Sequence, residues 1–168
     1  MIFSRKSLPT LGIHAPTPVV RRGRPSDILF PMTVSNTQGP TGAESPDLEG
    51  LRVLVVEDSW QVGTAVCNLL RSFGAEVLGL AATTADAELS LAEHVPDVVL
   101  MDVNLRGGEL AYDLIDRLHA RAIRVVVTTG YDEIALAPEK AIAVLGKPMN
   151  VSQLLSILRA VAAEKPAR

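Results

Sequence analysis

The sequence has few of the residues that define several classes of protein. A single cysteine, Cys67, excludes an internal disulfide, and its place in an apolar helical pattern predicts a buried thiol in a reducing compartment. The histidines His14, His94 and His119 are scattered, so no Cys/His cluster indicates zinc. No apolar run approaches the roughly 20 residues of a membrane span, and the start lacks a signal-peptide pattern. These absences favour a cytoplasmic protein without a membrane partner.

Charge is distributed unevenly along the chain, which carries a formal net charge of −3. The first 31 residues contain one acid, Asp27, against the bases Arg5, Lys6, Arg21, Arg22 and Arg24. The mildly acidic remainder argues against a broad nucleic-acid surface. The stretch "RRGRP" contains the Arg-Gly-Arg-Pro core of an AT-hook, which places arginines in A·T minor grooves. One copy with little flanking basic charge does not make DNA an expected partner.

The organisation of the chain changes near residue 50. Residues 1–50 show no sustained hydrophobic period, and "TVSNTQGPTGAESPDLEG" consists of turn and linker residues, which predicts a disordered N-terminal extension. Met32 directly precedes this linker and is an alternative start. Residues 51–168 suit one ordinary domain, since 48% of the chain is hydrophobic.

Short apolar runs alternate with helical patterns after residue 50. We predict strands at 52–57, 76–81, 98–102, 123–129 and 141–146. Helices are predicted after the strands. One of them, at 83–94, opens with threonines suited to capping. The other three have these apolar faces: Val62, Ala65, Val66, Leu69, Leu70 and Phe73; Leu110, Leu114, Ile115 and Leu118; Val151, Leu154, Leu155, Leu158 and Val161. Apolar strands separated by helices indicate a parallel sheet covered on both faces. We therefore expect an α/β, flavodoxin-like, doubly wound five-stranded parallel sheet with strand order 2-1-3-4-5.

Polar residues stand where these apolar strands end. Glu57 and Asp58 end the first strand, Asp102 ends the third, Thr129 the fourth, and Lys147 follows the fifth. Ligands of such sheets bind at the carboxyl ends of the strands, so these side chains should converge. Two carboxylates about 4 Å apart repel by roughly 4 kcal/mol at an effective dielectric near 20, so the acids need a cation or a proton. Mg²⁺ suits them because it is a hard ion that also keeps waters and phosphate oxygens.

A carboxylate placed beside a metal and a lysine can act as a nucleophile on phosphorus. Asp102 would then form an aspartyl phosphate. The metal and Lys147 would neutralise charge on the phosphoryl oxygens, and Thr129 would donate a hydrogen bond to the product.

These motifs resemble the receiver domain of two-component response regulators, from about Leu51 to Ala163. The segments "VLVVEDS", "PDVVLMDVNLRGG", "VVVTTGYDE" and "VLGKPMN" occur in the order of that family and near its spacing. The resemblance implies that Asp102 is the phosphoacceptor, Asp58 a direct metal ligand and Glu57 a ligand through water. It also implies four further roles: a metal-binding backbone carbonyl at Asn104, a switch hydroxyl on Thr129, a phosphoryl partner in Lys147, and a cis bond before Pro148.

Two features depart from the family pattern. In this chain Val144 stands where the family usually has the aromatic residue that reports phosphorylation. The segment between the fourth and fifth predicted strands is shorter than in the family and contains Pro138, so the helix expected there should be short or irregular. The Thr-Gly pair is similar to that of stand-alone receivers with a Phe-Ala-Thr-Gly motif, although Val127 and Thr128 replace Phe-Ala. Tyr131 is either a substitute reporter or an exposed loop residue.

Other readings of the acidic cluster explain less. Carboxylates that only cap helices leave Lys147 at the same edge unexplained. A phosphatase of the haloacid dehalogenase type would need a second aspartate where Asn104 stands. A receiver that folds without being phosphorylated stays open. Trp60 either lines the rim of the site or serves simple packing.

The expected function is that of a single-domain response regulator in a two-component or phosphorelay system. Asp102 would take a phosphoryl group, with Mg²⁺, from a sensor histidine kinase or a histidine phosphotransfer protein. The protein would be no enzyme beyond slow self-dephosphorylation. Only "EKPAR" follows the last helix, so the expected output is contact with a downstream protein. The alternative is a non-phosphorylated adaptor with the receiver fold.

Overall fold

The structure, a computed structural model, describes residues 20–21, 47–131 and 133–165. Most of the extension predicted to be disordered, and all of the Arg-Gly-Arg-Pro stretch at 22–25, fall on residues outside these ranges. The boundary near residue 50 stays a prediction. The packed chain includes residues on its N-terminal side, because Leu48 is completely buried in the core.

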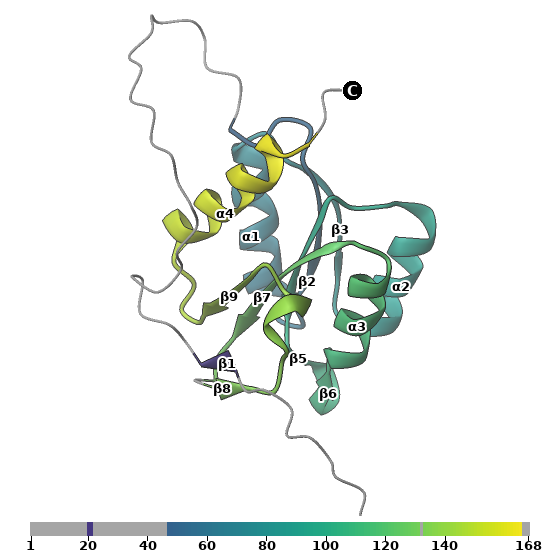
Figure 1. The fold of residues 1–168 in the computed structure, drawn as a ribbon. Helices are drawn as coiled ribbons and strands as arrows, with labels where there is room; N and C mark the ends of the chain where they lie inside the picture. Colours follow the sequence, from purple (N-terminus) through teal and green to yellow (C-terminus); the bar gives the residue numbers. More distant parts are fainter. Residues whose placement is uncertain (1–19, 22–46, 132, 166–168) are drawn as a thin grey trace, which may run out of the picture.

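The centre of the fold is the predicted five-stranded parallel sheet (Figure 1). Its strands are β2 (Arg52–Val56), β3 (Glu76–Ala81), β4 (Val98–Asp102), β7 (Arg124–Thr129) and β9 (Ala143–Gly146). They lie in the order β3-β2-β4-β7-β9, which confirms the order 2-1-3-4-5. The apolar runs of the sequence became the strands because β-branched residues pack well on a sheet that is buried on both faces.

The described residues form four α-helices: α1 (Trp60–Ser72), α2 (Thr84–Glu93), α3 (Tyr112–Ala120) and α4 (Val151–Ala163). These helices cover the two faces of the sheet (Figure 1). Alternate residues of β2 contribute to the cores on opposite faces of the sheet. Val53 and Val55 pack in one core with residues of α1 and α4, whereas Leu54 and Val56 pack in another with residues of α2 and α3. This two-sided burial makes the fold doubly wound.

The buried face of α1 differs from the predicted one. Val62 is 43% exposed, and the residues that face the sheet are Gly63, Val66, Cys67 and Leu70. The reason is close packing, since a Cβ added to Gly63 would lie 2.5 Å from a methyl carbon of Leu80. The predicted burial of Cys67 is confirmed, and desolvation raises the pKa of its thiol.

A short hairpin occupies the start of the predicted helix after the third strand. It joins β5 (Asn104–Leu105) to β6 (Glu109–Leu110), through a turn in which Gly107 and Gly108 have φ of 77° and 79°. Glycine adopts such angles without steric cost. Leu110 therefore lies outside α3 and is 52% exposed, so its assignment to the helical face was wrong.

The connection between β7 and β9 contains no α-helix among its described residues. It holds the short strand β8 (Glu133–Ile134), which pairs with β1 (Val20–Arg21), and the 3-10 helix η2 (Pro138–Lys140). Buried Ile134 and Leu136 fix this connection to the core shared with α2 and α3. The irregular segment predicted around Pro138 is confirmed.

None of the described helices is long and apolar enough to cross a membrane.

We expect Leu48→Ala to lower the free energy of unfolding by about 2–5 kcal/mol, because it removes a completely buried side chain from the core. The matched control is Leu89→Ala, since Leu89 is 70% exposed and its truncation should leave stability nearly unchanged. Urea denaturation of the full chain measures both. Equal effects of the two substitutions would contradict the placement of Leu48.

Candidate functional site

The acids predicted at the strand ends meet at one edge of the sheet. Carboxylate oxygens of Glu57, Asp58 and Asp102 all lie within 4.8 Å of one another. Glu57 and Asp102 are each only 6% exposed, whereas Asp58 is partly exposed. The parallel strands produce this cluster, because β2 and β4 are neighbours and both end at this edge.

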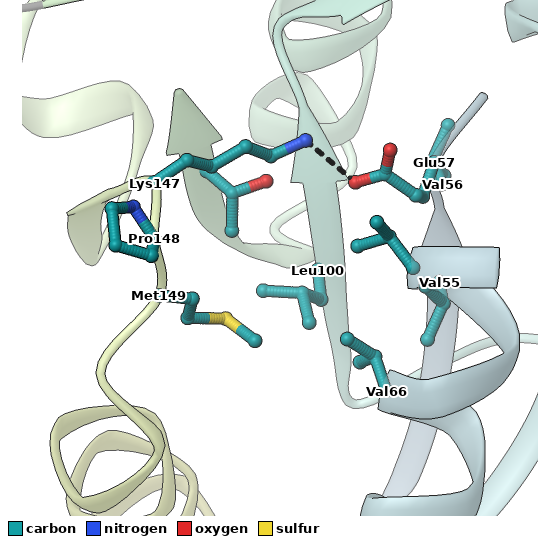
Figure 2. A pocket seen from close by; sticks show the side chains of 10 residues that line it. Val55, Val56, Glu57, Val66, Leu100, Lys147, Pro148 and Met149 are labelled. Atoms are coloured by element: carbon teal, nitrogen blue, oxygen red, sulfur yellow. Dashed lines mark hydrogen bonds and ion pairs between the residues drawn. The ribbon is translucent and has the colours of Figure 1, made fainter. Parts of the chain in front are cut away.

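Lys147 joins two of these acids. Its Nζ lies 2.7 Å from Glu57 Oε2 and 2.7 Å from Asp102 Oδ2. Figure 2 draws the pair with Glu57. Burial lowers the pKa of Lys147, but the hydrogen bonds and charges of Asp102 and Glu57 raise it more, so that it lies above its usual value of 10.5. Lys147 is therefore a cation at neutral pH, and its single charge offsets only part of the charge of the acids.

Backbone amides hold the other oxygens of the same two acids. The N–H of Asn104 donates to Asp102 Oδ1 over 3.1 Å, and the N–H of Ser59 donates to Glu57 Oε1 over 3.2 Å. Each carboxylate is thus oriented from two sides, which limits its rotation about the terminal torsion.

Thr129 ends β7, the strand next to β4, and is 1% exposed. Its hydroxyl accepts a hydrogen bond from the N–H of Tyr131 at 3.0 Å. Its carbonyl accepts one from the N–H of Lys147 at 2.8 Å, so the backbone links the predicted switch hydroxyl to the lysine. Tyr131 itself is 60% exposed, which agrees with the reading of an exposed loop tyrosine.

A pocket of about 290 Å³ opens beside the acids, between α1 and the loop from β9 to α4 (Figure 2). Apolar side chains line most of it, including Val55, Val66, Leu100 and Met149, and the pair of Lys147 and Glu57 lies at one side. The bond before Pro148, which also lines the pocket, is cis as predicted. Trp60, at the start of α1, is 70% exposed, which argues against simple packing as the role of this residue.

The cluster fits a hard divalent cation. Its donors are oxygens, and one lysine balances part of the charge of three carboxylates in a partly buried position. Glu57, Asp58 and Asp102 could bind Mg²⁺ through carboxylate oxygens. Asn104 lies in β5, two residues after Asp102 and close enough for its N–H to bind that carboxylate.

The sequence reasoning missed the hairpin that carries Asn104. The signal was present in the glycine pair at 107 and 108, which marks a turn with positive φ. It also missed Ser59, whose backbone amide orients Glu57, because any residue type supplies that N–H.

Residues 53–159 match the response regulator receiver domain family. The chain belongs to this family. The receiver domain is 32% identical over 112 residues to the transcriptional regulatory protein PdtaR of Mycobacterium tuberculosis, covering 62% of this chain and 53% of PdtaR. It is 30% identical over 116 residues to the swarming motility regulation protein RssB of Serratia marcescens, covering 66% of this chain and 52% of RssB. The chain thus spans about half the length of these relatives.

Solved structures of response regulators share the fold of this receiver domain. PhyR from Brucella abortus matches with a TM-score of 0.54 and 25% identity, covering 66% of this chain and 45% of PhyR. A putative response regulator from Chloroflexus aurantiacus matches with a TM-score of 0.59 and 25% identity, covering 67% of this chain and 98% of its own.

We expect Lys147→Met to lower the free energy of unfolding in metal-free buffer by about 1–3 kcal/mol, since it leaves the acids without their cation. Millimolar Mg²⁺ should stabilise this variant more than the wild type, because no lysine then competes for the carboxylates. Thermal unfolding with and without Mg²⁺ measures both effects.

The control for this test is Lys140→Met, which breaks an ion pair with Asp116 at a similarly exposed lysine, 32% against 31%. Lys140 lies in η2, outside the acidic cluster, so its loss should not change the response to Mg²⁺. An equal Mg²⁺ effect in the wild type and both variants would refute the competition between Lys147 and a cation.

The stabilising effect of Lys147 should vanish only in strongly alkaline solution. Because the folded protein holds the pKa of Lys147 above 10.5, the contribution is complete below that value and is lost as pH rises through the folded pKa. The stability difference between wild type and Lys147→Met should therefore stay constant from about pH 7 to about pH 9 and shrink above pH 10.5. Urea titrations across this range test it, and a difference that falls already near neutrality would contradict it.

Proposed function

We propose that this receiver domain accepts a phosphoryl group on Asp102 from a phosphohistidine of a sensor histidine kinase or a histidine phosphotransfer protein, with Mg²⁺ as cofactor. One observation carries the proposal. Asp102 is a buried carboxylate at a strand end, bonded to Lys147 and clustered with two further acids, in a chain of the receiver family. Clustered buried carboxylates are costly unless a cation offsets their charge, and such groups are typical of functional sites.

The transfer is a displacement at phosphorus. An oxygen of Asp102 forms a bond to phosphorus while the bond from phosphorus to the donor imidazole nitrogen breaks, and the electron pair leaves with that nitrogen. Lys147, a cation already in contact with Asp102, can turn to a phosphoryl oxygen of the product. The hydroxyl of Thr129 donates to a second phosphoryl oxygen. Mg²⁺, when bound, offsets charge on the phosphoryl oxygens.

The roles at the metal follow the donor set. Asp58 and Asp102 would bind the cation directly, Glu57 would act through water, and Asn104 would supply its backbone carbonyl.

Signalling would proceed by protein contact in the cytoplasm rather than by catalysis. A phosphodonor must cover the edge of the sheet where Asp102 lies. The first turn of α1 follows the acid pair and offers exposed Trp60 and Val62 beside the apolar pocket. Such exposed apolar residues favour a protein partner at this edge. Slow hydrolysis of the aspartyl phosphate would return the protein to its starting state.

Incubation with acetyl phosphate and Mg²⁺ should add one phosphoryl group to the wild type, as an acid-stable and base-labile adduct seen by intact mass. Asp102→Asn should gain none, because an amide is not a nucleophile toward phosphorus. The control Asp113→Asn, at an exposed position in the first turn of α3, should react like the wild type.

Two other outcomes would change the proposal. Uptake by Asp102→Asn would mean that another group is the acceptor. If the wild type takes up nothing from acetyl phosphate or from a panel of phosphorylated histidine kinases and phosphotransfer proteins, phosphotransfer is refuted and the non-phosphorylated adaptor takes its place.

A further inference from the structure

A carboxylate outside the acidic cluster ties the phosphoacceptor loop to the neighbouring helix. Glu109, in β6, accepts from the hydroxyl of Thr84 through Oε1 and from the N–H of Thr84 through Oε2, the latter over 3.4 Å. Thr84 is the first residue of α2, and the two residues are 25 positions apart in the sequence. Both are partly buried.

Glu109 acts on the hairpin that carries Asn104. In that hairpin Leu105 pairs with Glu109 and Asn104 pairs with Leu110, so the anchored residue adjoins the partner of Asn104. The base of the hairpin is held separately, by hydrogen bonds from Val103 N–H to Thr128 and from Ala111 N–H to Val103. Glu109 lies between these bonds and the turn at 107–108. Its side chain ties this part of the hairpin to α2 through Thr84.

The start of α2 benefits from the same contact. The first amides of a helix have no partner within the helix, and a carboxylate near them is stabilising. The side chain of Thr83 accepts a hydrogen bond from the N–H of Asp86, and the carboxylate of Glu109 accepts one from the N–H of Thr84. The strand before α2 also reaches the site, because Glu57 N–H donates to the carbonyl of Ala81 at 2.9 Å. The tether thus links loops on both sides of the acids.

We propose that Glu109 is a positioning residue for the metal site: by holding the hairpin against Thr84, it keeps Asn104 in place to bind a divalent cation beside Asp102, and it couples that cation to the first turn of α2. The inference rests on the proposed function, since it needs a cation at the acids. Coupling of this kind is reciprocal, so the cation should in turn protect the first turn of α2.

The test is calorimetric titration of the full chain with Mg²⁺. Glu109→Ala should weaken binding by about tenfold, as is usual when a group that orients a metal ligand is removed. Thr84→Val should act in the same direction, and the double variant should be no weaker than Glu109→Ala alone, because both substitutions break one contact. Glu109→Gln keeps the side-chain shape and serves if the alanine variant does not fold.

The matched control is Glu88→Ala, which removes another tether of α2. Glu88 Oε1 pairs with Nε of Arg117 in α3 at 2.6 Å, so this contact joins α2 to another helix and not to the hairpin. Its loss should leave Mg²⁺ affinity unchanged even where it lowers stability.

Hydrogen exchange supplies a readout that a purely structural role would not move. Mg²⁺ should slow amide exchange at the start of α2 in the wild type and in Glu88→Ala, but not in Glu109→Ala. If Glu109→Ala binds Mg²⁺ as tightly as Glu88→Ala and keeps this protection, the inference is overturned while the metal site stands. If the wild type itself binds no Mg²⁺, the proposed metal site fails, and the inference fails with it.

Discussion

The contact of Lys147 with Glu57 and Asp102 is the interaction on which the site depends. Three carboxylates share one edge of the sheet, and mutual repulsion would open this edge if no cation were present. Lys147 supplies one positive charge from the loop after β9, and its raised pKa keeps that charge through neutral pH. The remaining negative charge makes the site receptive to a divalent cation.

The parallel sheet brings these residues together from distant parts of the chain. Lys147 is 90 positions from Glu57 and 45 from Asp102. Their meeting needs only that β2, β4, β7 and β9 run in the same direction and lie in the observed order. The helices enforce that order by burying both faces of every central strand. Stability and the geometry of the site therefore have the same origin, which is the two-sided apolar core.

Features that follow from local sequence patterns could be predicted, whereas features that depend on contacts between distant elements could not. Strands and their order could be predicted, because each apolar run carries its own signal and right-handed crossovers restrict the topology. The side of α1 that faces the sheet could not be predicted in this way, because Gly63 has no apolar side chain and so does not contribute to a hydrophobic pattern. Its burial follows from close contact with Leu80, a residue of another element.

The sequence by itself determined the sheet, the cluster of acids with Lys147, and the irregular segment around Pro138, because these follow from local patterns and from the convergence of strand ends. Tertiary structure alone decided that Lys147 contacts Glu57 as well as Asp102, and that Glu109 reaches Thr84. Such side-chain pairs depend on the mutual placement of loops. No residue pattern encodes that placement, since it is fixed only when the packed helices and the hairpin settle against one another.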